Sequence, residues 1–202
     1  EYDRLFDEYY RGGSEGQFSI EETGDGKKYV RADRQVIYGN DPRAWSEQLE
    51  DYINGKIRRG QDVTLIGSDG DELRLTATTA GKVSSIYKDG KQLGDEYLFR
   101  KFSAGAHIDE LAETSRGFRN ANDEGNVHAS DASEGWNYRR AYFEDLDGAY
   151  YECTISVEKG SNGNVVYNIG QMKRRPFPTA PNPALQGSSA ESGARRGERR
   201  SV

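Results

Sequence analysis

The chain has 202 residues, which is about the length of one domain with some chain left over. Apolar residues make up 34% and charged residues 31%, and glycine occupies 24 positions, so we expect a modest core together with long solvated stretches. The single cysteine, Cys153, excludes an intramolecular disulfide framework. No run approaches the roughly 20 apolar residues of a membrane-spanning helix, so we expect no membrane contact and a cytoplasmic location.

Charge is distributed unevenly along the chain, whose net charge is -6. Residues 171–202 contain seven basic and two acidic residues, a net of +5, which leaves -11 for residues 1–170. An acidic domain has no overall field that attracts phosphate. Any contact with nucleic acid must therefore come from a local basic patch or from the C-terminal segment.

Residues 1–29 are interpreted as an N-terminal extension, with a short amphipathic helix within residues 1–16 and a strand at residues 18–21. An Asp-Gly turn joins this strand to a second one at residues 29–32 as a hairpin. Because no basic-then-apolar signal segment opens the sequence, we interpret it as a piece of a longer intracellular polypeptide.

Helical and strand patterns alternate across the next stretch. Asp41-Pro42 predicts a helix start, since Asp caps free backbone amides and Pro fits the first helical position, and Gly60 ends this helix. The patterns then predict a hairpin at 63–66 and 73–76, a mobile connection at 78–94, a helix at 95–115 and a polar loop at 116–134.

Three strands complete the folded part. Their expected positions are residues 136–144, 150–157 and 164–169, with Asp-Gly and Asn-Gly dipeptides at the two turns. Alternation along the middle strand places one set on the core face, namely Tyr151, Cys153, Ile155 and Val157. Thr154 and Ser156 fall on the opposite, open face.

These elements predict an α+β domain at residues 30–170. Helices pack on a twisted antiparallel sheet in the order helix, hairpin, helix and three-stranded meander. Residues 171–202 are rich in Pro, Ser and Arg, so we expect a disordered tail or linker there.

Standard catalytic motifs do not occur in the sequence. It contains no P-loop, dinucleotide-binding glycine fingerprint, CxxC, HExxH or GxSxG. We therefore expect no cofactor and no metal centre.

The two histidines, His107 and His128, both precede the three-stranded sheet. Histidine moves a proton near neutral pH, so a pair beside one sheet face is suited to cleave RNA through its 2′-hydroxyl. Arg140 would stabilise phosphate charge, and Thr154 or Ser156, brought beside it by antiparallel pairing, would orient the substrate. These five residues form the predicted catalytic site of a metal-independent ribonuclease.

The same open face also fits a hypothesis of a different class, a non-catalytic module that contacts another protein. RNA and protein are thus the alternative partners. A ribonuclease needs His107, His128 and Arg140 to converge in one pocket, whereas an interaction module needs only an exposed aromatic and apolar patch.

Several runs of the sequence resemble a known family. They are DVTLIGSDGDELRLTA, AHIDELAETS and WNYRRAYFEDLDGAYYECTISVEKGSNGNVVYNIG. Across residues 30–170 the chain resembles the large polyvalent protein-associated domain of the third type, which occurs in giant multidomain proteins of phages and mobile elements. The arrangement is also similar to phage nucleases of the barnase, EndoU, colicin and RelE group. The resemblance implies a module delivered with phage proteins, with His107 and His128 before the sheet and Arg140 in its first strand.

Overall fold

The computed structural model describes residues 19–57, 61–88, 90–122, 134–161 and 163–178. Of these residues, 41% lie in strands and 28% in helices. The N-terminal half contains β1 (Ile20–Glu22), β2 (Lys28–Arg31), α2 (Pro42–Lys56), β3 (Val63–Ile66), β4 (Glu72–Leu75) and α3 (Ala77–Val83). The rest contains β5 (Tyr87–Lys88), β6 (Lys91–Gln92), α4 (Asp95–Gly105), α5 (Ile108–Thr114), β7 (Arg116–Ala121), β8 (Gly135–Glu144), β9 (Tyr150–Gly160) and β10 (Gly163–Arg175).

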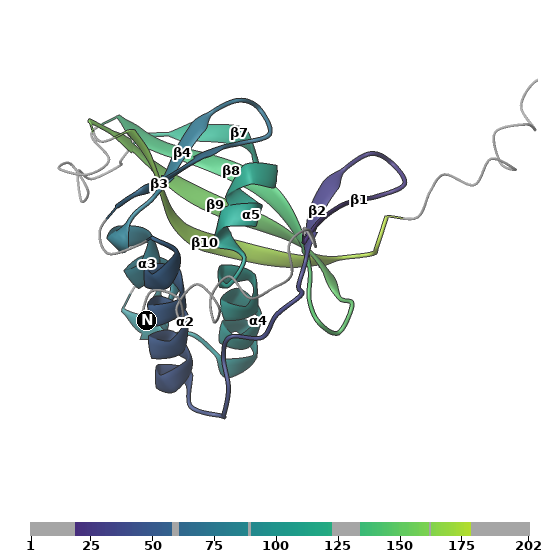
Figure 1. Ribbon diagram of the computed structural model, residues 1–202, viewed down its shortest axis with the longest axis vertical. Helices are drawn as coiled ribbons and strands as arrows, with labels where there is room; N and C mark the ends of the chain where they lie inside the picture. Colours follow the sequence, from purple (N-terminus) through teal and green to yellow (C-terminus); the bar gives the residue numbers. More distant parts are fainter. Residues whose placement is uncertain (1–18, 58–60, 89, 123–133, 162, 179–202) are drawn as a thin grey trace, which may run out of the picture.

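The main sheet is mixed and curls into a half-barrel (Figure 1). Its strand order is β1-β2-β8-β9-β10-β4-β3, and β7 pairs with β8 as well. The β2–β8 and β10–β4 pairs are parallel, whereas the other pairs are antiparallel. The predicted arrangement of helices on a twisted antiparallel sheet is therefore wrong. The β1–β2 and β3–β4 hairpins add to the two sides of the predicted meander through parallel pairs, because long connections rather than hairpin turns join β2 to β8 and β4 to β10.

Two features curl the sheet. Irregular register in β10, between Val166 and Asn168 and between Ile169 and Gln171, bends its long strand. The β3–β4 hairpin then returns to the start of β7, where the Ser68 amide donates to the Ser115 carbonyl at 3.0 Å. The β3–β4 hairpin and β7 thereby meet at the upper end of the sheet in Figure 1, which we call the barrel mouth.

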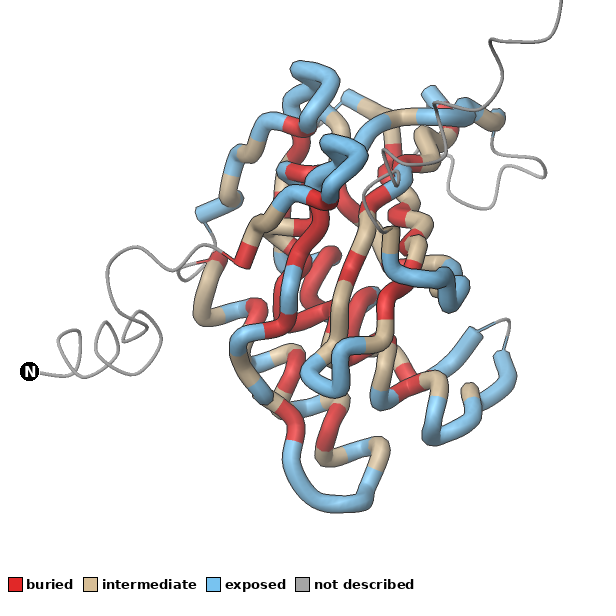
Figure 2. The backbone as a smooth tube through the Cα atoms, turned by 90° about the vertical axis from the view of Figure 1, so that its right-hand side faces the viewer, coloured by how far each residue is buried: buried red, intermediate tan, exposed pale blue. Residues whose placement is uncertain are grey.

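The core lies inside this curve. Cys153, Ile155 and Val157 are fully buried and Tyr151 is 3% exposed, so the predicted facing of β9 is confirmed. Helix α5 lies against β2, β3 and β8 and contributes Ile108 and Leu111 to the same core. Figure 2 shows the buried positions concentrated toward the middle of the molecule.

Local sequence chemistry explains several element boundaries. Helix α2 begins at Pro42, as predicted, and the Asp41 carboxylate accepts the Arg43 amide at 2.9 Å. The helix predicted at 95–115 is divided, because the backbone of His107 (φ -115°, ψ 27°) leaves the helical conformation between α4, which ends at Gly105, and α5, which begins at Ile108. Leu49 and Val83 pack close to the backbone at Gly105. A Cβ at Gly105 would come within 2.9 Å of both side chains, so glycine permits the close approach.

Two predicted connections contain regular structure. The stretch 78–94 holds most of α3 and the β5–β6 hairpin, and residues 116–121 of the predicted loop form β7. Strand β10 continues to Arg175, inside the segment expected to be a tail. The predicted helix within residues 1–16 and most of the tail, from residue 179 on, lie outside the described residues. Within the described ranges, no helix is long and apolar enough to cross a membrane.

Candidate functional site

His107 lies on the core side of the sheet. It is fully buried at the start of α5, and its ring centroid is 5.8 Å from that of Phe143 on β8. Its two ring nitrogens lie 3.8 Å from Asp33 and from Glu110, too far for hydrogen bonds. The histidine is therefore part of the packing between α5 and the sheet.

A cluster of charged side chains lies beside His107, between α2 and α5. The Lys56 ammonium is 2.6 Å from Asp109, and Arg34 is 2.8 Å from Glu110. Burial raises the pKa of Asp109 to about 7, together with its neighbour Glu110. Burial opposes the charge of Glu110 as well, but Asp109, His107 and Lys56 outweigh it and lower its pKa. Opposite charges within the cluster balance one another, which is the usual condition for burying them.

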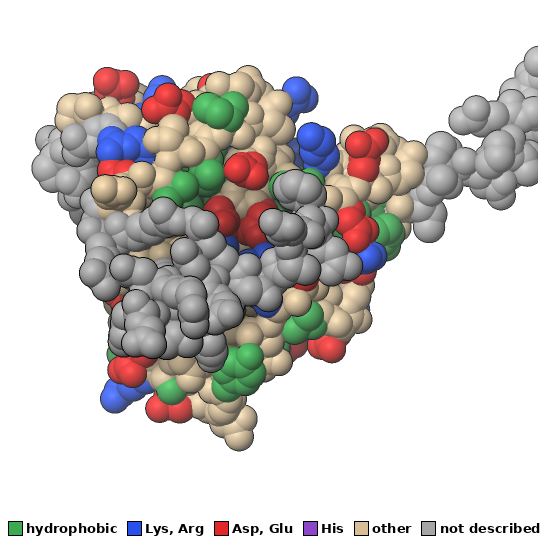
Figure 3. All heavy atoms as spheres, viewed as in Figure 1, with side chains coloured by type: hydrophobic (Ala, Val, Ile, Leu, Met, Phe, Trp, Pro, Cys, Tyr) green, Lys and Arg blue, Asp and Glu red, His purple; other side chains and the backbone are tan. Residues whose placement is uncertain are grey.

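The surface around this cluster is mixed in charge. Figure 3 shows acidic and basic side chains interspersed over the face that carries the helices, with a recessed acidic group near its centre. In the part of the chain that the structure describes, no three His, Cys, Asp or Glu side chains form a group that could hold a metal ion.

Arg140, Thr154 and Ser156 come together on the opposite side of the sheet. Arg140 pairs with Thr154 across β8 and β9, and Ser156 lies two pairs further along, opposite Tyr138 and on the same side of the sheet. We call this outer surface of β7, β8, β9 and β10 the open face. The Ser156 hydroxyl donates to the Asn168 carbonyl at 3.2 Å.

The predicted catalytic residues are divided between the two sides of the sheet. Phe143, which contacts His107, points inward, whereas Arg140 points outward from the same strand. His128 lies outside the described residues. The structure thus brings Arg140, Thr154 and Ser156 together and separates them from His107.

Basic side chains gather on the open face. They are Arg116 and Arg119 on β7, Arg140 on β8, and Lys173 and Arg175 on β10. Cross-strand pairing places Arg116 opposite Arg140 and Lys173 opposite Glu152. Glu152 lies 3.4 Å from Arg140 and 3.2 Å from Arg175, so one carboxylate is shared by two guanidinium groups.

Aromatic rings are interleaved with these cations. The Arg119 guanidinium lies 4.2 Å from the Tyr138 ring centroid, and the Arg140 guanidinium lies 4.8 Å from that of Phe118. Phe118 occupies an irregular position in β7 and is 47% exposed. These contacts hold the guanidinium planes near exposed ring surface, where a planar ligand could stack on either group.

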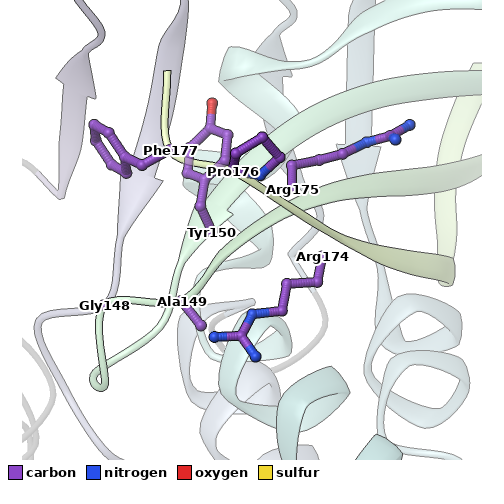
Figure 4. Close-up of a pocket in the computed structure, with 7 residues that line it drawn as sticks. All are labelled: Gly148, Ala149, Tyr150, Arg174, Arg175, Pro176 and Phe177. Carbon is purple, nitrogen blue, oxygen red and sulfur yellow. The ribbon is translucent and has the colours of Figure 1, made fainter. Parts of the chain in front are cut away.

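A second aromatic group continues the open face at the far ends of β8 and β9. Tyr142 and Tyr150 stack at 5.8 Å with an interplanar angle of 5°, and Phe177 meets Tyr150 edge-on at 5.1 Å. A shallow hollow of about 460 Å³ lies here. Figure 4 shows its two arginines, Arg174 and Arg175, pointing away from each other, so they do not converge on one ligand. The rings extend the aromatic surface and leave 41% of Phe177 exposed.

Sequence reasoning missed Phe118, Arg116 and Arg119. They lie in the run RGFRNA, whose glycine and lack of apolar periodicity predict part of a polar loop. Its pairing with β8 makes it a strand. Comparisons of the chain with family models, with curated proteins and with solved structures find no match.

Proposed function

We propose that the open face binds single-stranded nucleic acid, with cations that contact phosphates and rings that stack on bases. The observation that carries the proposal is the interleaving of five basic side chains with Phe118, Tyr138 and Tyr142 around the single shared carboxylate of Glu152. Surfaces that bind single strands combine these two features.

The acidic net charge of the chain does not oppose this proposal. Charges that are exposed to solvent are screened over about 8–10 Å at ordinary ionic strength. A phosphate at Arg116 or Arg119 therefore responds mainly to the cations beside it. Neither of these arginines forms an ion pair with another described residue, and both are exposed.

In this proposal Arg140, Thr154 and Ser156 contact the nucleic acid and do not cleave it. The position of His107 on the core side supports this choice, since a general acid or base must reach the substrate. We also propose that the module belongs to a large polyvalent protein of a phage or mobile element. Binding would there hold nucleic acid against its neighbouring domains.

The test is fluorescence anisotropy with labelled single strands of ten nucleotides, one RNA and one DNA of the same sequence. Removing two phosphate contacts in Arg116→Ala/Arg119→Ala should weaken binding at least tenfold. The slope of log K against log salt should also fall by about 1.4, since each phosphate contact contributes about 0.7. Arg43→Ala is the matched control, because Arg43 is an exposed cation on α2.

Equal binding by the parent protein and the double variant would remove the open face from the interface. Binding of neither RNA nor DNA would favour the protein-interaction hypothesis instead. A gel assay of RNA integrity in the same samples tests the ribonuclease hypothesis, in which His128→Ala would abolish degradation that Arg43→Ala leaves intact.

A further inference from the structure

The barrel mouth contains a polar cavity of about 330 Å³, within the roughly 300–1,000 Å³ range of small-molecule sites. Side chains from five strands or their ends line it. The polar ones are Asp71, Asn120, Asn137, Arg139, Lys159 and Asn164. These residues come from the β3–β4 hairpin and from β7, β8, β9 and β10. The hairpin approaches β7 at the upper end of the sheet in Figure 1. The edge of β7 separates it from the open face.

Arg139 fixes the walls of this cavity. It is fully buried, and its guanidinium donates to Asp71 at 2.7 Å, to the Ser115 hydroxyl at 2.8 Å and to Asp69. Further bonds go to the Ser115 carbonyl and to Asn137. Its donors are thus all used within the protein, so Arg139 positions other groups and offers nothing to a ligand.

This network determines which way the neighbouring amides point. Because Arg139 donates to the Asn137 oxygen at 3.4 Å, the Asn137 nitrogen turns outward and donates to the Asn120 oxygen at 2.9 Å. The Asn120 nitrogen is then left as a donor. The Asn164 nitrogen donates to the Glu72 carbonyl at 3.1 Å, which leaves the Asn164 oxygen as an acceptor.

Four polar groups at the cavity therefore have no partner among the described residues. Two are acceptors, the Asn164 oxygen and the second carboxylate oxygen of Asp71. The other two are donors, the Asn120 nitrogen and the Lys159 ammonium. A small ligand that satisfies all four groups needs two N–H donor groups and two acceptors.

We infer that the barrel mouth binds a guanine base. Among the four RNA bases only guanine carries two separate donor groups, N1–H and the N2 amino group, which would meet the two acceptors of Asp71 and Asn164. Its O6 and N7 atoms are acceptors and match Asn120 and Lys159. The inference deepens the proposed function, since a strand whose phosphates lie on Arg119 would pass the edge of β7 beside Asn120.

The experiment measures binding of GMP, IMP and AMP to the whole chain by isothermal titration calorimetry. IMP lacks the N2 amino group, and AMP replaces the N1–H donor and the O6 acceptor. GMP should bind roughly 5–150-fold more tightly than either, the range of one good bidentate base contact. Equal affinities for the three nucleotides, or no binding of GMP, would overturn the inference.

Asn120→Asp locates the site. It replaces a donor by a charged acceptor of the same size and should reduce GMP affinity at least tenfold. Asn122→Asp makes the same change just beyond β7 and should leave affinity unchanged. Thermal unfolding of both variants checks that they are folded, and undiminished GMP binding by folded Asn120→Asp places the ligand elsewhere. Binding of a uridine decamer separates the two proposals, because this strand contains no guanine. It should bind to the open face whether or not GMP binds at the barrel mouth.

Discussion

The carboxylate of Glu152 lies 3.4 Å from the guanidinium of Arg140, near the centre of the open face, and only 19% of the Glu152 side chain is exposed. This contact holds Arg140 in place beside Phe118, but it also occupies the cation that would contact a phosphate. The pair therefore makes the open face sensitive to a change of a single charge.

The first prediction follows from this competition. Glu152→Gln keeps the size of the side chain and removes the negative charge, so single-stranded RNA should bind about two- to fivefold more tightly, in line with about 0.5–1 kcal/mol for a partly exposed ion pair. Anisotropy at low salt measures the change. Glu47→Gln, at an exposed position on α2, should have no effect. Weaker binding by Glu152→Gln would mean that Glu152 positions Arg140 more than it competes with phosphate.

A second prediction contrasts two glycines. A Cβ at Gly67 would overlap the Arg139 guanidinium, whereas a Cβ at Gly81, inside α3, would meet only Glu50 at 3.9 Å. Gly67→Ala should lower the free energy of unfolding by about 1–3 kcal/mol through overpacking. Gly81→Ala should raise it by roughly 0.5–1 kcal/mol through helix propensity. Urea unfolding of the two variants tests the pair, and the same sign for both would contradict the role of Arg139 at the barrel mouth.

The part of the fold that local patterns encode could be predicted from the sequence. Asp41-Pro42 marks the start of α2, and alternation in β9 separates Cys153 and Ile155 from Thr154. These features depend on neighbouring residues and on the period of a strand. The open-face position of Arg140 follows from the same period.

The curl of the sheet depends on contacts that no local pattern records. Arg139 joins Asp69 and Asp71, some seventy residues earlier, and this pairing brings the β3–β4 hairpin to β7. In the sequence, the Asp69-Gly70-Asp71 run predicts only a turn. In the fold, its two carboxylates also pair with Arg139. The sequence likewise predicts His107 near the sheet, but the break between α4 and α5 decides on which side of the sheet the histidine lies.

A third prediction concerns Lys101, which is 1% exposed and donates to the Ser85 carbonyl at 3.0 Å. Burial, with a smaller contribution from Lys88, lowers its pKa from 10.5 to about 8. Between pH 8 and about 10.5 the unfolded chain then binds more protons at this group than the folded chain. The contribution of Lys101 to the free energy of unfolding therefore rises with pH through this window.

Lys101→Met removes the titrating group and retains most of its volume. Relative to this variant, the parent protein should become more stable as pH rises from 8 to 10, by at most about 1.4 kcal/mol for each pH unit. Urea unfolding at several pH values measures the difference between the two proteins. Parallel stability curves would show that Lys101 keeps its ordinary pKa in the folded chain.

The last prediction separates the two sides of β9. Ile155 is fully buried, so Ile155→Ala should cost about 2–5 kcal/mol of unfolding free energy, as large-to-small core substitutions do. Thr154 lies on the open face opposite Arg140, and Thr154→Ala should change stability by at most about 0.5 kcal/mol.

Binding of single-stranded RNA should show the reverse pattern. Folded Ile155→Ala keeps the parent affinity, whereas Thr154→Ala loses a hydroxyl that can donate to a phosphate and binds several-fold more weakly. If Ile155→Ala weakened RNA binding as much as Thr154→Ala in samples that are fully folded, the nucleic acid would not be bound by the open face alone.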